Sequence, residues 1–300
     1  MNLKSIHLLL TYSCNLECDH CFLYCSPRSK GTFTIHQIKE LLKEVKKIES
    51  IDSLGFEGGE PFLMYPLLLE AVRLASRQEL KTSIQTNGYW ANSEEDAELW
   101  LEPLHQAGLS YIDISADLFH HGEEVSKTTE YALAAAKTIG IPTKTICIDT
   151  PDEPDTDNQN KGKPVYKGKA KLRGRAAEKL TKGLAAQPWE TFTECPYEDL
   201  RSPGRVHLDS YGNVHLCQGL SMGNIWETPL SQLLKTYKPE EHPVCGPILR
   251  GGPAELARSY GIQLDQESVD ACHFCTGLCK ELISKFPQFI TPKQVYGIES

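Results

Sequence analysis

Three cysteines, Cys14, Cys18 and Cys21, lie close together near the start of the sequence, just after an apolar run at residues 6–10 that predicts a strand. Three thiolates on one short loop can bind three irons of a [4Fe–4S] cluster and leave the fourth iron open, whereas such clusters are usually held by four cysteines. An open iron predicts a site that binds a further ligand, as open positions do in catalytic metal sites. A structural zinc site with Cys25 as its fourth ligand is the alternative.

Length and composition restrict the class of protein. The chain has 300 residues, a formal net charge of −9, 40% hydrophobic residues and 24% charged residues, which is typical of a globular protein. The negative charge argues against a nucleic-acid partner. We expect no signal peptide and no membrane span, and therefore a cytoplasmic location, where eleven cysteines indicate metal or redox chemistry rather than disulfides.

Strand-like and helix-like segments alternate along the first part of the chain. We expect strands at residues 4–11, 53–56, 81–85, 111–115 and 143–148, with a sixth near 164–166. We expect helices at residues 34–48, 66–77, 93–107 and 123–139. This alternation predicts a parallel sheet with helical crossovers, an α/β fold. The polar stretch at 150–163 predicts a loop or a lid.

The pattern changes after Pro188. Residues 205–209 and 213–217 flank Ser210-Tyr211-Gly212 and predict a hairpin. Short helices and cysteine-rich stretches follow. We therefore expect two domains, at residues 1–180 and 181–300.

A Gly58-Gly59-Glu60-Pro61 turn follows the second expected strand. Two glycines let the backbone approach a ligand closely, and Glu60 can accept hydrogen bonds from an ammonium group; a plain surface turn is the alternative. Together with the cysteine loop, this turn resembles the paired motifs of the radical S-adenosylmethionine (SAM) superfamily. The resemblance implies that the loop binds a [4Fe–4S] cluster chelated by SAM, and that the turn binds the amino group of SAM.

Further polar residues gain roles from the resemblance. Asn87, Ser115 and Asp117 lie just past strand ends, where ligands of parallel α/β folds bind, and the resemblance assigns them to the ribose and carboxylate of SAM. An Asx turn or a helix cap is the alternative for each. His20 stands where the superfamily usually has an aromatic residue beside the adenine. Arg175 is expected to pair with a carboxylate of SAM or substrate, or else to belong to a solvated basic loop.

A second group of cysteines lies in the tail, where Gly212 precedes Cys217 by the same short interval as in the SPASM/Twitch extension. The resemblance to that extension implies one auxiliary [4Fe–4S] cluster. The expected ligands are Cys195, Cys217, Cys272 and Cys275, with Cys279 as the alternative to Cys275. A zinc knuckle with the same ligands is the alternative site. Cys147, inside an expected strand, is interpreted as a core residue.

The resemblance implies a partial (β/α)6 TIM-like barrel with a small C-terminal α+β cysteine-rich domain. It implies an enzyme that cleaves SAM reductively to a 5′-deoxyadenosyl radical, which abstracts hydrogen from a peptide or a small molecule, with a net two-electron oxidation as one outcome. The expected reductant is a ferredoxin or a flavodoxin. Because the loop starts at residue 14, a small molecule is favoured, or a peptide delivered by a separate partner. A non-catalytic zinc protein or electron carrier is the alternative function.

Overall fold

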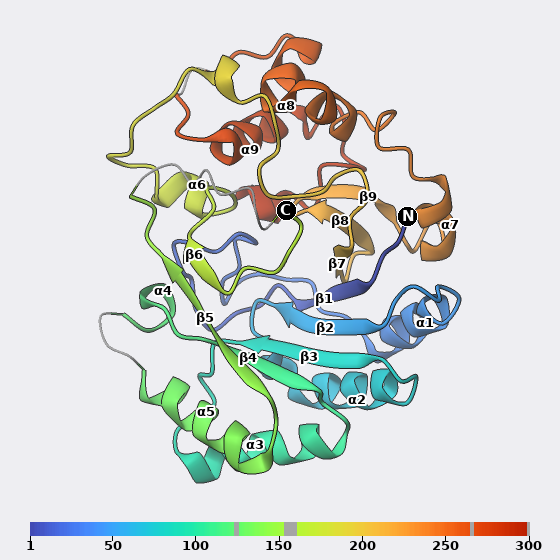
Figure 1. Cartoon of the computed structure of the whole chain (residues 1–300), viewed down its shortest axis with the longest axis vertical. Helices are drawn as coiled ribbons and strands as arrows, with labels where there is room; N and C mark the ends of the chain where they lie inside the picture. The colour runs from blue at the N-terminus through green and yellow to red at the C-terminus, as the bar shows by residue number, and fades with distance from the viewer. Residues whose placement is uncertain (123–125, 153–160, 265–266, 299–300) are drawn as a thin grey trace.

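A nine-stranded sheet runs through the protein. The computed structural model describes residues 1–122, 126–152, 161–264 and 267–298. The strands lie in the order β6-β5-β4-β3-β2-β1-β7-β8-β9 (Figure 1). Their bounds are β1 Ser5–Thr11, β2 Ser53–Gly58, β3 Lys81–Thr86, β4 Tyr111–Ser115, β5 Thr143–Asp149, β6 Lys167–Lys169, β7 Arg205–Asp209, β8 Asn213–Cys217 and β9 Leu220–Asn224.

The first six strands are all parallel to their neighbours, which confirms the α/β fold. The crossover helices are α1 Ile35–Val45, α2 Tyr65–Ser76, α3 Glu94–Gln106 and α5 Lys127–Ile139. Helix α1 shows why these segments are helical: Thr34 and Gln37 form a capping box, and the helix buries Ile38, Leu41, Leu42 and Val45 along one face. Parallel strands need such crossovers.

Three expected boundaries differ in the structure. The helix expected at 123–139 begins at Lys127, because Ser126 caps it by accepting a hydrogen bond from the Thr128 amide; a short helix, α4 Leu118–His121, precedes it. The sixth strand is at Lys167–Lys169, since its ladder with β5 starts where Cys147 pairs with Lys167. Within the expected lid at 150–163, residues 153–160 lie outside the described residues.

The tail continues the same sheet. The expected hairpin is present as β7 and β8, and a third strand that the sequence did not predict, β9, pairs with β8. β7 pairs in parallel with β1, from Ser5 opposite Arg205 to Leu9 opposite Asp209. The sheet therefore crosses the boundary expected at residue 180, and the division into two domains stays a prediction.

The remaining helices belong mainly to the tail, where α8 and α9 gather at the end of the molecule opposite α3 and α5 (Figure 1). None of the helices in the described ranges is long and apolar enough to cross a bilayer. Their bounds are α6 Ala176–Lys179, α7 Leu230–Thr236, α8 Cys245–Tyr260 and α9 Ala271–Leu282, with 3₁₀ turns η1 Pro61–Met64, η2 Trp189–Thr191 and η3 Lys293–Tyr296.

Candidate radical SAM site

The cysteine loop connects β1 to α1 at one end of a cavity of about 210 Å³, which Cys14, Cys18 and Cys21 all line. The backbone of the loop is fixed by a hydrogen bond from the Cys21 amide to the Cys18 carbonyl, 3.1 Å, and by another from Cys14 to Ser26, 3.1 Å. The amide of Cys25 donates to the Cys21 Sγ at 3.3 Å. The structure thus brings the three predicted ligands to the lining of one cavity.

Burial and hydrogen bonding shift the pKa values of these thiols in different directions. Burial raises the pKa of Cys14 and of Cys18 to about 12. A hydrogen bond from the Cys25 thiol lowers the pKa of Cys21 to about 6. Two of the three thiolates therefore need a positive partner, which iron ions would supply.

Arg175 binds the backbone of the cysteine loop. Its Nη1 donates to the Cys18 carbonyl and its Nη2 to the Cys25 carbonyl, both at 2.7 Å, and its own amide donates to the Cys21 carbonyl at 2.9 Å. The guanidinium also lies over the Tyr24 ring, 4.6 Å from its centroid. The buried guanidinium thus binds two carbonyls of the loop, and the SAM or substrate contact expected for Arg175 stays a prediction.

The Gly-Gly-Glu-Pro turn also binds the backbone at the start of the cysteine loop. The Gly59 amide donates to the Thr11 carbonyl at 2.7 Å, and the Glu60 amide donates to the Ser13 carbonyl at 2.9 Å. A Cβ added to Gly59 would lie 2.1 Å from the Ser13 oxygen, and one added to Gly58, where φ is +133°, would lie 2.3 Å from the Thr11 oxygen. Both glycines also line the cavity. Because they have no side chain, the backbone of the turn can lie close both to the cysteine loop and to a ligand.

Glu60 is not among the residues that line the cavity. Its Oε1 accepts hydrogen bonds from the Phe62 amide at 3.0 Å and the Thr86 hydroxyl at 2.8 Å, and its Oε2 accepts one from the Asn87 amide at 2.8 Å. Burial raises the pKa of Glu60 to about 7, against these bonds. The carboxylate ties the turn to Thr86 at the end of β3 and to Asn87, and the ammonium contact expected for Glu60 stays a prediction.

The strand-end residues divide into two groups. Asn87 and Ser115 line the cavity, and Asn87 donates to the Asn15 side chain of the cysteine loop at 2.9 Å. Asp117 lies outside that cavity and caps α4, bound to the His120 ring at 2.7 Å, which matches its alternative as a helix cap. His20 lines the cavity, stacks on Phe119 with 4.5 Å between ring centroids, and leaves its buried Nδ1 without a hydrogen-bond partner among the described residues.

The tail cysteines surround a second, smaller cavity of about 50 Å³. Three of them lie on one face of α9, and the others come from β8 and from the segment before β7. Cys245 is not among its lining residues, although it is fully buried. The cysteines that line the cavity are Cys195, Cys217, Cys272, Cys275 and Cys279.

Arg173 lies between the two cavities and lines both. Its Nη1 donates to Glu198 at 2.8 Å and to the Cys217 Sγ at 3.2 Å, and its guanidinium lies 5.7 Å from the Phe22 ring centroid, next to Cys21. Sequence analysis missed this residue, although it stands two positions before Arg175 in the same basic segment.

Comparison with known proteins identifies the family. The sequence profile described as the radical SAM superfamily matches residues 8–159, half of the chain. The chain belongs to the radical SAM superfamily. Membership implies a [4Fe–4S] cluster and SAM, and the three thiols that line one cavity, together with the buried ring nitrogen of His20 that has no partner among the described residues, fit that pair.

Individual relatives match over shorter stretches. A Bacillus subtilis protein named for peptide biosynthesis, YydG, is 30% identical over 117 residues, 39% of this chain and 37% of that one. An S-adenosylmethionine-dependent nucleotide dehydratase from a Fibrobacter species is 27% identical over 133 residues, 42% of this chain and 38% of the relative. The matched region therefore spans less than two fifths of these relatives' lengths.

A solved structure shares the fold. BtrN, crystallised in complex with AdoMet and 2-DOIA, superposes with a TM-score of 0.51 at 17% identity, over 77% of this chain and 81% of that one. The likeness extends beyond the profile match, and with the parallel strands it confirms the partial barrel expected for a radical SAM protein.

The radical SAM cavity collects most, but not all, of the expected residues. Of the expected cofactor-binding residues, Glu60, Pro61, Asp117 and Arg175 are not among its lining. Cys147, interpreted as a core residue, is half-buried on β5, so that interpretation is wrong. The expected residues that line the cavity are Cys14, Cys18, Cys21, His20, Gly58, Gly59, Asn87 and Ser115.

The close approach at Gly59 leads to a prediction. Gly59→Ala should displace the cysteine loop, since the new methyl group would lie 2.1 Å from the Ser13 oxygen. We expect the reconstituted variant to lose about four irons per chain relative to the native protein, as measured by iron analysis. Gly204→Ala is the matched control, because nothing lies within 4 Å of a Cβ at that position. Equal iron content in both variants would contradict the role of Gly59.

Proposed function

We propose that Cys14, Cys18 and Cys21 bind a [4Fe–4S] cluster whose open iron is chelated by SAM, and that a peptide or small-molecule substrate binds in the same cavity. When bound and reduced, this pair supplies a 5′-deoxyadenosyl radical that abstracts a hydrogen atom from the substrate. The observation that carries the proposal is the cavity of about 210 Å³ lined both by the three thiols and by the strand ends. Arg175 and Gly59 keep the loop in position from two sides.

The strand ends supply the groups that would orient SAM. Gly58, Gly59, Asn87 and Ser115 present backbone and side-chain polar groups to the cavity, and His20 offers a flat ring for the adenine. Enclosure by Leu16, Leu23, Ile146 and Ile148 would exclude water from the radical, as a closed active site does. The reductant proposed is a ferredoxin or flavodoxin, acting in the cytoplasm.

Residues 181–300 are proposed to hold one auxiliary [4Fe–4S] cluster, with residues 1–180 as the radical SAM core. Support comes from the five cysteines that line one cavity. The name of the relative YydG favours a peptide as substrate.

The test is a turnover assay without substrate. The chain is reconstituted anaerobically with iron and sulfide, reduced with dithionite and mixed with SAM, and 5′-deoxyadenosine is measured by mass spectrometry. We expect slow reductive cleavage that depends on both dithionite and SAM. Iron-loaded protein that forms no 5′-deoxyadenosine would favour a non-catalytic metal protein instead.

A further inference from the structure

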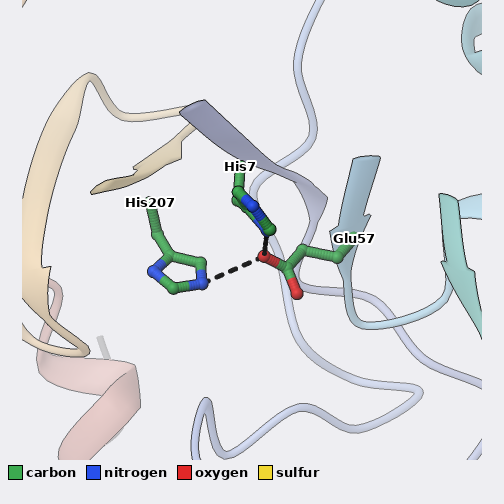
Figure 2. A group of neighbouring side chains, drawn as sticks. All are labelled: His7, Glu57 and His207. Atoms are coloured by element: carbon green, nitrogen blue, oxygen red, sulfur yellow. Dashed lines mark hydrogen bonds and ion pairs between the residues drawn. The ribbon is translucent and has the colours of Figure 1, made fainter. Parts of the chain in front are cut away.

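A second group of potential metal ligands, free of cysteine, lies on the inner face of the barrel. His7, Glu57 and His207 come from three neighbouring strands, β1, β2 and β7, and converge in Figure 2. His7 is directly opposite His207 in the parallel ladder, and Glu57 is opposite Leu9. All three are buried, and Glu57 and His207 line the same cavity as the cysteine loop.

The three side chains meet at one oxygen. The Nδ1 of His7 lies 2.8 Å and the Nε2 of His207 lies 3.0 Å from Oε1 of Glu57, and the three ligand atoms all lie within 4.8 Å of one another. In an octahedral shell with bonds of about 2.1 Å, neighbouring ligand atoms are about 3 Å apart. The separations of 2.8 Å and 3.0 Å therefore suit a Glu57 oxygen that is a neighbour of each imidazole nitrogen in one coordination shell.

Neighbouring residues hold this arrangement. The side-chain amide of Gln218 contacts the His207 ring, with Nε2 3.2 Å from Nδ1, and its buried Oε1 has no hydrogen-bond partner among the described residues. With the amide turned over, that oxygen would accept a hydrogen bond from the Nδ1–H of His207, the outer contact that orients a metal-binding imidazole. A Cβ at position 55 would lie 3.2 Å from Nδ1 of His7, so Gly55 leaves room for that ring.

The charge of the group is incomplete. Glu57 is a buried carboxylate whose ion-pair contacts are the two imidazoles. In the described ranges, no lysine or arginine forms an ion pair with Glu57. Its second oxygen points away from both rings in Figure 2. A buried anion without a cationic partner is costly, and a divalent cation would compensate it.

We propose that His7, Glu57 and His207 bind one divalent first-row transition-metal ion, with the open coordination positions toward the cavity. Two histidines and one carboxylate are a ligand set known for such ions when they keep open positions. Those positions would bind an oxygen or nitrogen atom of the substrate and hold it against the radical source. Metal binding by this group is independent of the cysteines, whereas its role in holding the substrate rests on the proposed function.

The test uses Mn²⁺ as the probe, because carboxylate and imidazole ligands bind it and thiolates do not favour it. The full chain, reconstituted with iron and oxidised so that its clusters are silent, is titrated with Mn²⁺ while the six-line electron paramagnetic resonance signal of free Mn²⁺ is followed. We expect one Mn²⁺ to bind per chain. Glu57→Gln, which keeps the size of the side chain, should weaken binding at least about a hundredfold, more than loss of an outer contact does.

Asp113→Asn is the matched control, since Asp113 is a buried carboxylate of β4 outside the group; it should keep its affinity for Mn²⁺. Pulsed resonance on the native protein adds a readout that needs no variant: nitrogen couplings from two imidazoles are expected on the bound ion. Absence of Mn²⁺ binding, binding without nitrogen couplings, or equal losses in the two variants would overturn the proposal and leave a hydrogen-bonded triad.

Discussion

The variant in which Cys14, Cys18 and Cys21 are all replaced by alanine should form no 5′-deoxyadenosine above background. Cys14, Cys18 and Cys21 line the cavity of about 210 Å³ together with Cys25. Without the three thiols, no cluster with an open iron forms to chelate SAM. The measurement is 5′-deoxyadenosine by mass spectrometry after anaerobic reconstitution and reduction. Native rates in this variant would rule out the assignment of the loop.

Cys25→Ala separates a cluster from a zinc site in the same loop. A four-thiolate zinc site would include Cys25 and would lose its metal in this variant. A three-cysteine cluster does not need that thiol as a ligand, although the Cys25 amide still donates to the Cys21 Sγ. We therefore expect iron analysis of Cys25→Ala to match the native protein.

The triple variant that lacks Cys14, Cys18 and Cys21 should keep about four irons per chain, as expected for one remaining [4Fe–4S] cluster in the tail. Cys195, Cys217, Cys272 and Cys275 line a cavity separate from the first loop, so loss of the first site leaves them intact. The signal of the reduced variant in electron paramagnetic resonance should not change when SAM is added, because four thiolates leave no iron open. One zinc and no iron per chain would instead make the tail a structural knuckle.

The fourth ligand of the proposed tail cluster is either Cys275 or Cys279. Cys279 lines the same cavity as Cys275, and hydrogen bonds from the Cys275 thiol and the Tyr296 hydroxyl lower its pKa. In the background of the triple variant, alanine at the true fourth ligand should remove the tail iron, whereas alanine at the other position should not. Loss in both variants would mean that all five cysteines are needed to assemble the site.

Local sequence patterns predicted the elements that depend on local physics. The capping box at Thr34 and the apolar stripe of α1 are visible in sequence because they lie within one helix. β9 was missed because Leu220–Asn224 contains a serine, a glycine and an asparagine, and is held mainly by pairing with β8. Side-chain direction was also missed: nothing in Gly-Gly-Glu-Pro tells that Glu60 turns inward to Thr86 and Asn87.

The group of His7, Glu57 and His207 shows what spacing cannot reveal. Glu57 and His207 are distant in sequence and meet only because β7 is added next to β1. A signal was present, however. Each of the three is a polar residue between apolar or glycine neighbours in a strand, and a polar residue buried in a sheet usually has a partner.

The parallel pairing of β1 with β7 has a consequence for synthesis of the chain. β1 is made first, yet one of its two edges stays uncovered until Arg205–Asp209 have left the ribosome. Pairings between such distant segments form slowly, and an uncovered strand edge invites pairing with another chain. A chain cut before residue 205 would keep every cysteine of the first loop and still expose that edge, so truncation should lead to aggregation rather than to a smaller working enzyme.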